Sequence, residues 1–389
     1  MNEENSPGRV DSLVAVGPVL RAHAADAERA NRLSEEAVKA LREAGLFRLG
    51  VPRPFGGRAA GLTASVEVIA ELAKSCPSSS WVVAVSYGAQ QIAARFAERT
   101  RRGLWADDPD QAFCGSLTSI AASAVRVPGG QIVTGRWGWA SGAYQAVWAV
   151  LTMPIMDERN EVVDQGVALV PMSNLSIVDT WNMMGMRGTG TNTLTASDVF
   201  IPEERILSFA KVIQPAETIE ANYRTSLGSL ALTFVATMLG ATEEVFDATM
   251  RVVAGDKPLS DSCYERLADA PSIRSDIANA RNLIDSARLH VLRSANWADA
   301  VVEGGAELDE VARARLRMDA GYASKALRTA ADLLVNVGGA SSLSATNPVQ
   351  RYWRDIHTAA RHPTITTELS EEIYGHALVG SGQRVSPLV

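Results

Sequence analysis

The sequence is poor in the residues that mark metal-dependent or disulfide-stabilised proteins. Its 389 residues include only three cysteines and five histidines. Cys76, Cys114 and Cys263 form no C-x-x-C pair, and an odd, sparse set argues against a disulfide framework and against a zinc site. No H-E-x-x-H pair occurs, and the spacing of His357 and His362 would place them on different faces of a helix. We therefore expect no metal site.

The sequence also lacks excess positive charge and long apolar runs. The formal net charge is -7, whereas nucleic-acid binding needs clustered lysine and arginine. The longest nearly apolar runs, 146–156 and 230–241, are shorter than the roughly 20 residues that cross a bilayer. The first residues, MNEENSPGR, are polar and acidic, unlike a signal peptide. We expect a cytoplasmic protein that contacts neither nucleic acid nor a membrane.

Enough apolar material is present for a large core, because hydrophobic residues make up 47% of the chain. At about 100–200 residues per domain, the length suggests two or three domains. The residue patterns change twice along the chain, and we expect an N-terminal helical domain over 1–109, a middle β domain over 110–212 and a C-terminal helical bundle over 213–389.

The first hundred residues carry helix signals. Ser34 is expected to cap a helix that begins with two glutamates, and Gly45 suits its C-terminal end. Further helices are expected over 63–74 and 81–96, with a break at 76–80.

From about residue 112 the pattern favours strands. Segments 124–127 and 131–134 flank Pro-Gly-Gly and predict a hairpin. Dense β-branched and aromatic residues predict further strands over 147–156, 167–170 and 193–201.

The last third is helical again. Apolar residues recur at spacings of four and three, which predicts a long bundle helix; they are Ile273, Ile277, Ala280, Ile284, Ala287 and Val291. A second long helix is expected over 307–337, ending at Gly338 and Gly339.

Several segments in this order resemble the acyl-CoA dehydrogenase superfamily. They are Val51-Pro52-Arg53-Pro54-Phe55-Gly56-Gly57, Gly135-Arg136-Trp137-Gly138-Trp139-Ala140-Ser141-Gly142, Met184-Gly185-Met186-Arg187-Gly188-Thr189-Gly190-Thr191, Asp198-Val199-Phe200-Ile201-Pro202, Val337-Gly338-Gly339 and Trp353-Arg354-Asp355. The resemblance covers nearly the whole chain. It implies a mainly α fold with a small middle β-barrel or sandwich and a C-terminal four-helix bundle.

The C-terminal region distinguishes two chemistries within this superfamily. Many dehydrogenases carry a catalytic glutamate shortly after the Arg-Asp pair, but here His362 follows Asp355 by seven residues. This resembles the group D two-component flavin monooxygenases. The resemblance implies that reduced flavin (FADH2 or FMNH2) comes from a separate reductase. The flavin would react with O2 to give a C4a-peroxide. That peroxide would oxygenate an aromatic, heteroaromatic (phenol- or indole-type) or amine substrate. The glycines at 185, 188 and 190 lack dinucleotide-binding spacing, which agrees with a separate reductase. A homotetramer is also implied.

The resemblance assigns roles to individual residues. Ser141 would contact flavin N5, and Trp139, expected on the same strand face, would pack on the flavin ring. Ser116 would contact flavin or substrate. His362 is the candidate acid or base, since its pKa lies near neutrality. His357 is expected to have no catalytic role.

A second set of residues is assigned by position. Tyr87 and Gln90 are expected to face the substrate, where relatives place a histidine that this chain lacks. Arg274 would reach the cofactor of a neighbouring subunit, and Gly338 and Gly339 are taken as cofactor-binding. The adjacent Arg354 and Asp355 are expected to form a structural ion pair, and they have no assigned catalytic role.

Two other functions remain open from the sequence. An acyl-CoA dehydrogenase or related FAD-dependent desaturase would need a displaced carboxylate base, for which Glu368, Glu371 and Glu372 are candidates. A helical scaffold that has lost its flavin is the non-enzymatic alternative.

Overall fold

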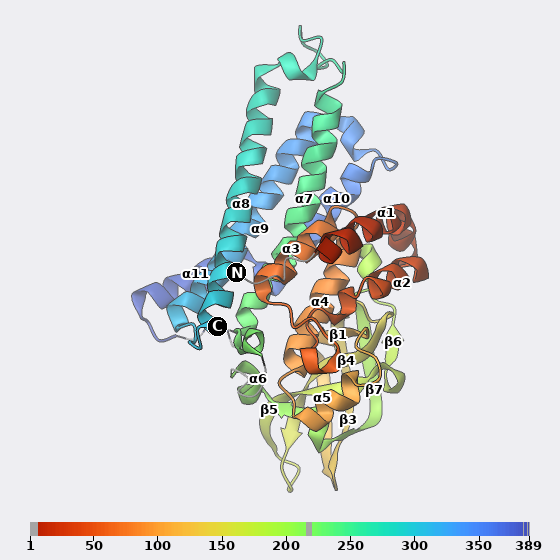
Figure 1. The fold of residues 1–389 in the computed structure, drawn as a ribbon, viewed down its shortest axis with the longest axis vertical. Coiled ribbons are helices and arrows are strands. Elements are labelled where there is room, and N and C mark those ends of the chain that lie inside the picture. Colours follow the sequence, from red (N-terminus) through yellow and green to blue (C-terminus); the bar gives the residue numbers. More distant parts are fainter. Residues whose placement is uncertain (1–6, 215–219, 384, 387, 389) are drawn as a thin grey trace.

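The computed structural model describes residues 7–214, 220–383, 385, 386 and 388, and its elements follow the expected order of helices, strands and helices (Figure 1). The last N-terminal helix ends at Trp105 and the first strand begins at Ala112, while the last strand ends at Ser208. We therefore keep domain divisions after residues 109 and 212 as a proposal. The interpretation of the first residues as lacking a signal peptide falls largely on residues 1–6, outside the described part.

The N-terminal region consists of α1 (Pro7–Ala30), α2 (Glu35–Glu43), α3 (Leu62–Ala73), α4 (Pro77–Ala93) and α5 (Glu98–Trp105). As predicted, the Ser34 side chain accepts a hydrogen bond from the Ala37 amide, and Gly45 after α2 has a positive φ of 65°. The predicted break at 76–80 was wrong in extent. Pro77 occupies the first turn of α4, where its missing N–H costs nothing, so the serines after it are helical and buried.

The middle region is a sandwich of two four-stranded sheets. One sheet has the order β1-β4-β5-β8 and the other β2-β3-β7-β6, and all pairs are antiparallel except β1 with β4. The strands are β1 (Ala112–Ser116), β2 (Ser119–Val127), β3 (Gly130–Ala140), β4 (Ala146–Met156), β5 (Val162–Pro171), β6 (Ser176–Val178), β7 (Asn192–Pro202) and β8 (Ile206–Ser208).

The predicted hairpin is present as β2 and β3. Strand β5 begins five residues before the predicted one, because it pairs with β4 beyond the apolar stretch that marked it. The three strands of five residues or fewer had not been predicted. Buried side chains such as Val133, Trp137 and Leu151 fill the space between the sheets.

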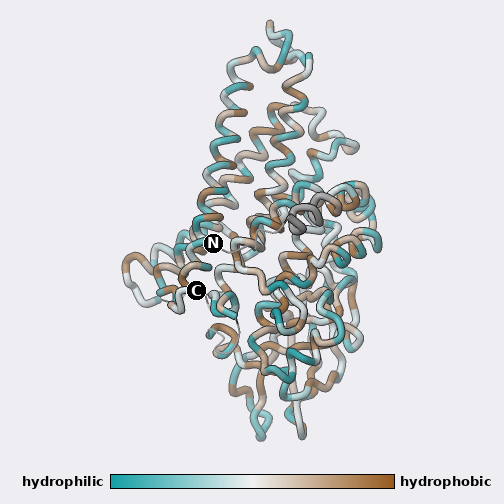
Figure 2. Tube along the Cα trace, in the orientation of Figure 1, coloured by the Kyte–Doolittle hydropathy of each residue, from teal (hydrophilic) through white to brown (hydrophobic). Residues whose placement is uncertain are grey.

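The C-terminal region is a helical bundle. Its helices are α7 (Ala231–Val253), α8 (Pro271–Glu303), α9 (Glu310–Gly338), α10 (Pro348–Ala359) and α11 (Thr367–Val379), whereas the short α6 (Phe209–Ile213) follows the last strand and packs on β5. The predicted apolar residues of α8 are buried except for the half-buried Ile277, and Figure 2 shows hydrophobic and hydrophilic residues alternating along the long helices.

One segment of the bundle, Leu227–Val253, is long and apolar enough to cross a membrane by length and composition. However, 78% of its most apolar window is buried inside the protein. Leu227–Val253 therefore packs as a core helix in this fold.

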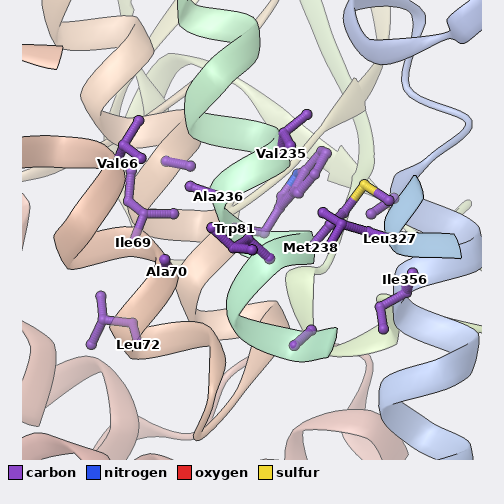
Figure 3. Packing of buried hydrophobic residues seen from close by; sticks show 14 of the residues in the cluster. Val66, Ile69, Ala70, Leu72, Trp81, Val235, Ala236, Met238, Leu327 and Ile356 are labelled. Carbon is purple, nitrogen blue, oxygen red and sulfur yellow. The ribbon is translucent and has the colours of Figure 1, made fainter. Parts of the chain in front are cut away.

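Helices α3 and α4 connect the bundle to the sandwich (Figure 1). Helix α3 packs closely on α7, since a Cβ at Gly240 would lie 1.8 Å from the Ala70 carbonyl oxygen. Figure 3 shows Trp81 of α4 among side chains from α3 and α7, including Ile69 and Val235. This junction brings residues of all three regions to one place.

Candidate functional site

Trp81 lies at the centre of the candidate site. Its indole Nε1 donates a hydrogen bond to Ser141 Oγ at 3.2 Å. The edge of its ring meets the ring of His362, with centroids 5.5 Å apart and planes at 71°. Trp81 therefore brings together Ser141 and His362, the two residues predicted to be catalytic, although they come from the sandwich and the bundle respectively.

Ser141 belongs to a chain of buried hydroxyl groups. Its Oγ lies 2.8 Å from Thr191 Oγ1, which lies 2.6 Å from Thr189 Oγ1, and Thr189 donates to the Met186 carbonyl. Hydroxyl groups can both donate and accept, so these residues can adjust to the hydrogen-bonding pattern of a ligand without carrying charge.

The expected common strand face of Trp139 and Ser141 is wrong. Trp139 has a positive φ of 63°, and the β3–β7 register shifts between Trp137 and Ala140. This break in the strand leaves Trp139 60% exposed while Ser141 is 6% exposed. The ring of Trp139 instead packs edge-on against Trp181 at 5.9 Å.

An exposed apolar surface surrounds this bend. Trp139, Ile120 and Leu117 are all exposed, and Gly138 lies beside Ile120, since a Cβ there would be 3.3 Å from Ile120 Cδ1. Ser116 is buried next to it, and its hydroxyl lies 2.7 Å from the Gly138 carbonyl oxygen, to which it can donate, and 3.0 Å from that of Thr118. Ser116 therefore holds the main chain just before Trp139.

His362 packs between two aromatic rings. Besides Trp81, its ring contacts Phe234 of α7, with centroids 4.6 Å apart. It begins the turn Pro363–Ile365, where its Nδ1 accepts a hydrogen bond from the Thr364 amide. Burial, with a further contribution from Arg317, lowers the pKa of His362 to about 4.

Leu230 and Phe234 are site residues that the sequence reasoning missed. Both are half-buried on the face of the bundle that meets α4, where a Cβ at Gly88 would lie 3.8 Å from Leu230 Cδ1. Within α4, Val85 and Gly88 are likewise only half-buried, whereas the rest of the helix is buried. Their spacing from Trp81 places both on its helix face. The i, i+4 spacing of Leu230 and Phe234 in the apolar run was the available signal.

Tyr87 and Gln90 do not share that face, so their expected orientation is wrong. The Tyr87 hydroxyl donates to the Ala60 carbonyl. Gln90 accepts from the Gly50 amide and donates to the Phe47 carbonyl. Both side chains therefore attach α4 to the segment before α3, because helix geometry turns positions 87 and 90 away from position 81.

Arg354 and Asp355 do not pair with each other, which corrects the expected ion pair. Arg354 forms an ion pair with Glu28 at 2.5 Å, and Asp355 accepts a hydrogen bond from the Met186 amide. Adjacent helix positions point in different directions, so each reaches a separate partner. A Cβ at Gly185 would lie 2.2 Å from the Arg354 carbonyl oxygen. The 184–191 loop is thus held tightly against α10.

Arg274 lies in the first turns of α8, and Gly338 and Gly339 lie at the end of α9; Figure 1 shows these two helix ends on the side of the bundle away from the strands. Arg274 donates to the Ala268 and Asp269 carbonyls, and Lys257 of the same loop donates to the Gly338 carbonyl. These three predicted cofactor residues therefore form a second group, which one chain does not bring to Ser141.

The remaining candidates lie outside the site. His357 is 2.9 Å from Asp332 and contacts the Trp353 ring, and burial lowers its pKa. Three glutamates considered as displaced bases are all exposed on α11: Glu368, Glu371 and Glu372. Within the described ranges, no three His, Cys, Asp or Glu side chains gather into a group that could hold a metal ion.

Comparison with known proteins identifies the family. The profile of the acyl-CoA dehydrogenase N-terminal domain matches residues 16–104 and that of its C-terminal domain residues 232–367. Oxygenase subunit HsaA of a flavin-dependent monooxygenase from Rhodococcus jostii is 32% identical, over 94% of this chain and 96% of that protein. The oxygenase component of an FADH2-dependent resorcinol hydroxylase from a Rhizobium species is 29% identical, over 95% of this chain and 94% of that protein.

A solved structure shows the same fold over nearly the whole chain. XiaF from a Streptomyces species, in complex with FADH2 and glycerol, has a TM-score of 0.93 and 30% identity, covering 98% of this chain and 96% of that one. The chain therefore belongs to the oxygenase components of flavin-dependent monooxygenases, which are built on the acyl-CoA dehydrogenase fold.

Proposed function

We propose that this chain accepts reduced flavin, FADH2 or FMNH2, from a separate reductase and uses O2 to oxygenate a small aromatic or heteroaromatic substrate. The observation that carries the proposal is the meeting of Ser141 and His362 on either side of Trp81, beside the exposed Trp139. HsaA and the resorcinol hydroxylase component are both flavin-dependent oxygenase components, which supports the same chemistry here.

The residues around Trp139 fit a flavin. An isoalloxazine ring is flat and largely apolar, with hydrogen-bonding atoms along its edges. Trp139, Leu117 and Ile120 offer exposed apolar surface, and Ser141, two residues after Trp139, forms a hydroxyl pair with Thr191. When bound, reduced flavin activates O2 and supplies one oxygen atom, which is chemistry that no side chain provides.

This chain's own residues orient the ring, exclude water and control protons. Trp139 would stack against the flavin, and Ser116 would hold the strand end from which Trp139 projects. Ser141 would present its hydroxyl to the flavin edge, oriented by the Trp81 indole. His362 would exchange a hydrogen bond with the reacting group, within an aromatic enclosure that limits the access of water.

The half-buried residues suggest the class of substrate. Val85, Gly88, Leu230 and Phe234 are uncharged, and His362 is neutral at pH 7 because its pKa is about 4. An anionic group placed against Val85, Gly88, Leu230 and Phe234 would lose hydration without a charged partner among these four residues. We therefore favour an uncharged ring, of the phenol or indole type, over a carboxylate-bearing end at this position; an amine-bearing substrate remains the alternative.

We propose a homotetramer, and the two separated groups of predicted cofactor residues support a site shared between its subunits. In such an assembly the bundle end with Arg274, Gly338 and Gly339 would reach the flavin held by a neighbouring subunit. Co-expression tests this directly. At reduced-flavin concentrations too low to saturate either variant, Trp139→Ala and Arg274→Ala should each be impaired alone and should together regain activity, because mixed assemblies contain sites with both residues intact. No recovery in isolated mixed assemblies would contradict a site shared between subunits. A cytoplasmic location, where a reductase can draw on reduced nicotinamide, completes the proposal.

An acyl-CoA dehydrogenase is the less supported alternative. It would need a carboxylate base near the flavin, but Glu368, Glu371 and Glu372 are exposed on α11. The non-enzymatic alternative, a helical scaffold that binds no flavin, gives no reason for the exposed aromatic surface at Trp139.

Anaerobic mixing with reduced FMN or reduced FAD, followed by addition of oxygen in a stopped-flow spectrometer, tests the proposal. An oxygenase should show a transient near-ultraviolet species before oxidised flavin appears, and the preferred flavin should give the longer lifetime. Ser141→Ala and His362→Ala should shorten the lifetime or slow formation, whereas Ser123→Ala, an exposed serine of β2, should change neither. Direct oxidation of flavin without a transient would contradict the proposal.

A further inference from the structure

Arg317 of α9 is a buried cation without an ion-pair partner among the described residues. Arg317 is only 2% exposed to solvent. Its Nη2 donates to the Pro363 carbonyl at 2.5 Å, and its Nε lies 3.4 Å from Ser370 Oγ. Burying a charge is costly unless it is paired, so a guanidinium held by neutral oxygens alone suggests a function that requires the charge.

The same surface of α9 holds the turn that carries His362. Thr367 Oγ1 donates to the Gly321 carbonyl at 3.0 Å, and a Cβ at Gly321 would lie 2.6 Å from Ser370 Cβ. Arg317 adds the hydrogen bond to Pro363, the residue next to His362. The turn is therefore held against α9 at Pro363, directly after His362, and again at Thr367 and Ser370 beyond its end.

The hydrogen bonds of the His362 ring define its protonation. The backbone N–H of Thr364 points at Nδ1 at 3.3 Å, and Thr364 Oγ1 lies 2.7 Å from the same atom. A backbone amide can only donate, so Nδ1 is assigned as an acceptor without a proton. In the neutral ring the proton is then on Nε2, which makes no hydrogen bond within residues 220–383.

The groups facing His362 leave Arg317 as the main charge near it. Helix α4 presents Trp81 and α7 presents Phe234, and neither can titrate. Thr364 is uncharged, and Ser370 of α11 is the neutral residue beside Arg317. The neighbouring Arg361 is exposed to solvent, which screens its charge.

We propose that Arg317 is a positioning residue that fixes His362 as a neutral ring with its proton on Nε2, by holding Pro363 and by placing a buried positive charge beside it. His362 then serves as a hydrogen-bond donor through Nε2 and not as a cationic acid. Its catalytic use rests on the proposed oxygenase function, but its protonation state does not.

The shift in the pKa of His362 is in the direction that this proposal requires. Burial is the larger cause and the Arg317 charge the second, and together they lower the pKa of His362 to about 4. A nearby like charge disfavours the protonated ring, so removing the charge should raise the pKa on the order of one unit while burial keeps it below the ordinary value.

Hydrogen–deuterium exchange at the imidazole carbon, followed by mass spectrometry across pH, reports the pKa of each histidine in the intact protein and needs no turnover. We would compare the wild type with Arg317→Met, Arg317→Lys and a control, Arg313→Met. Arg313 lies one turn earlier on α9 and likewise donates to a backbone carbonyl, that of Leu308.

The wild type, Arg317→Lys and Arg313→Met should show no His362 midpoint above about pH 5, whereas Arg317→Met should move the midpoint up by about one unit. In turnover, the acid limb of kcat should shift upward by the same amount in Arg317→Met alone. A wild-type midpoint near the ordinary 6.5, or equal midpoints in Arg317→Met and wild type, would overturn the proposal. The wild-type midpoint can overturn the proposal by itself, so the misfolding of one variant would not leave the proposal untested. If these midpoints hold but no oxygenation occurs, only the proposed function fails.

Discussion

The indole Nε1 of Trp81 donates its hydrogen bond to Ser141 Oγ across the junction between α4 and the sandwich. Ser141 is the residue expected to contact the flavin, and Trp81 was not among the residues singled out from the sequence. The orientation of the serine hydroxyl therefore depends on a helix about sixty residues earlier in the chain.

Trp81→Phe should test this dependence. The change retains an aromatic ring but removes the N–H donor, so the Ser141 hydroxyl loses an interaction of about 1 kcal/mol and can rotate. We expect a several-fold shorter lifetime of the transient in stopped flow. Trp105→Phe is a matched control, because the buried Trp105 Nε1 has no partner in the described part of the chain. Equal effects of both changes would argue against a role for the hydrogen bond.

Trp139→Ala should weaken the binding of reduced flavin. Trp139 is 60% exposed and held on a strained bend, and base- or ring-stacking on an exposed aromatic contributes about 1–3 kcal/mol. Anaerobic titration should show roughly tenfold or greater loss of affinity. Phe200→Ala removes a similarly exposed aromatic from β7 and should bind as the wild type does. Unchanged affinity in Trp139→Ala would place the flavin elsewhere.

Asp355 should make stability depend on pH. Burial raises its pKa to about 7, above the ordinary 3.8, although the Met186 amide opposes the shift. Between these values the folded state keeps a proton that the unfolded state has lost. This contribution therefore stabilises the protein at low pH and is lost as pH rises towards 7, by about 1.4 kcal/mol per unit.

Asp355→Asn should remove that dependence. We expect the difference in unfolding free energy between variant and wild type to favour the variant more at pH 8 than at pH 5, by up to about 3 kcal/mol in denaturant titrations. A difference that is the same at both pH values would show that Asp355 does not titrate in this range.

Gly185→Ala should disrupt the contact between the 184–191 loop and α10. Its Cβ would lie 2.2 Å from the Arg354 carbonyl oxygen, which is main chain and cannot move aside cheaply. We expect a loss of about 2–4 kcal/mol in unfolding free energy and a lower activity. Gly375→Ala, in α11 with nothing within 4 Å of the new Cβ, should be neutral or stabilising by up to about 1 kcal/mol.

Much of the fold could be predicted from the sequence, because it depends on local signals. The Ser34 cap, the Pro-Gly-Gly hairpin and the three–four spacing of apolar residues in α8 each describe a segment of chain that forms its structure with its own neighbours. The start of α4 at Pro77 was missed because proline disrupts a helix interior but suits a first turn.

The site itself was only partly predictable. The chain order and motifs pointed to Ser141 and His362, but the contact that joins them passes through Trp81. Trp139 left the face of Ser141 because a bend in β3 changed the alternation of side chains, and no local pattern announces such a bend. Tyr87 and Gln90 face away from the site because the orientation of α4 was unknown until its packing was seen.

Local patterns and motifs therefore predicted the kinds of elements, their order, and which residue types were available for flavin chemistry. Tertiary structure alone decided which side chains meet: the pairing of Arg354 and Asp355 with different partners, the turn of His362 against Arg317, and the separation of Arg274 from Ser141. The physical reason is that secondary structure follows from contacts within a few residues, whereas these positions depend on how rigid helices and sheets pack over long sequence separations.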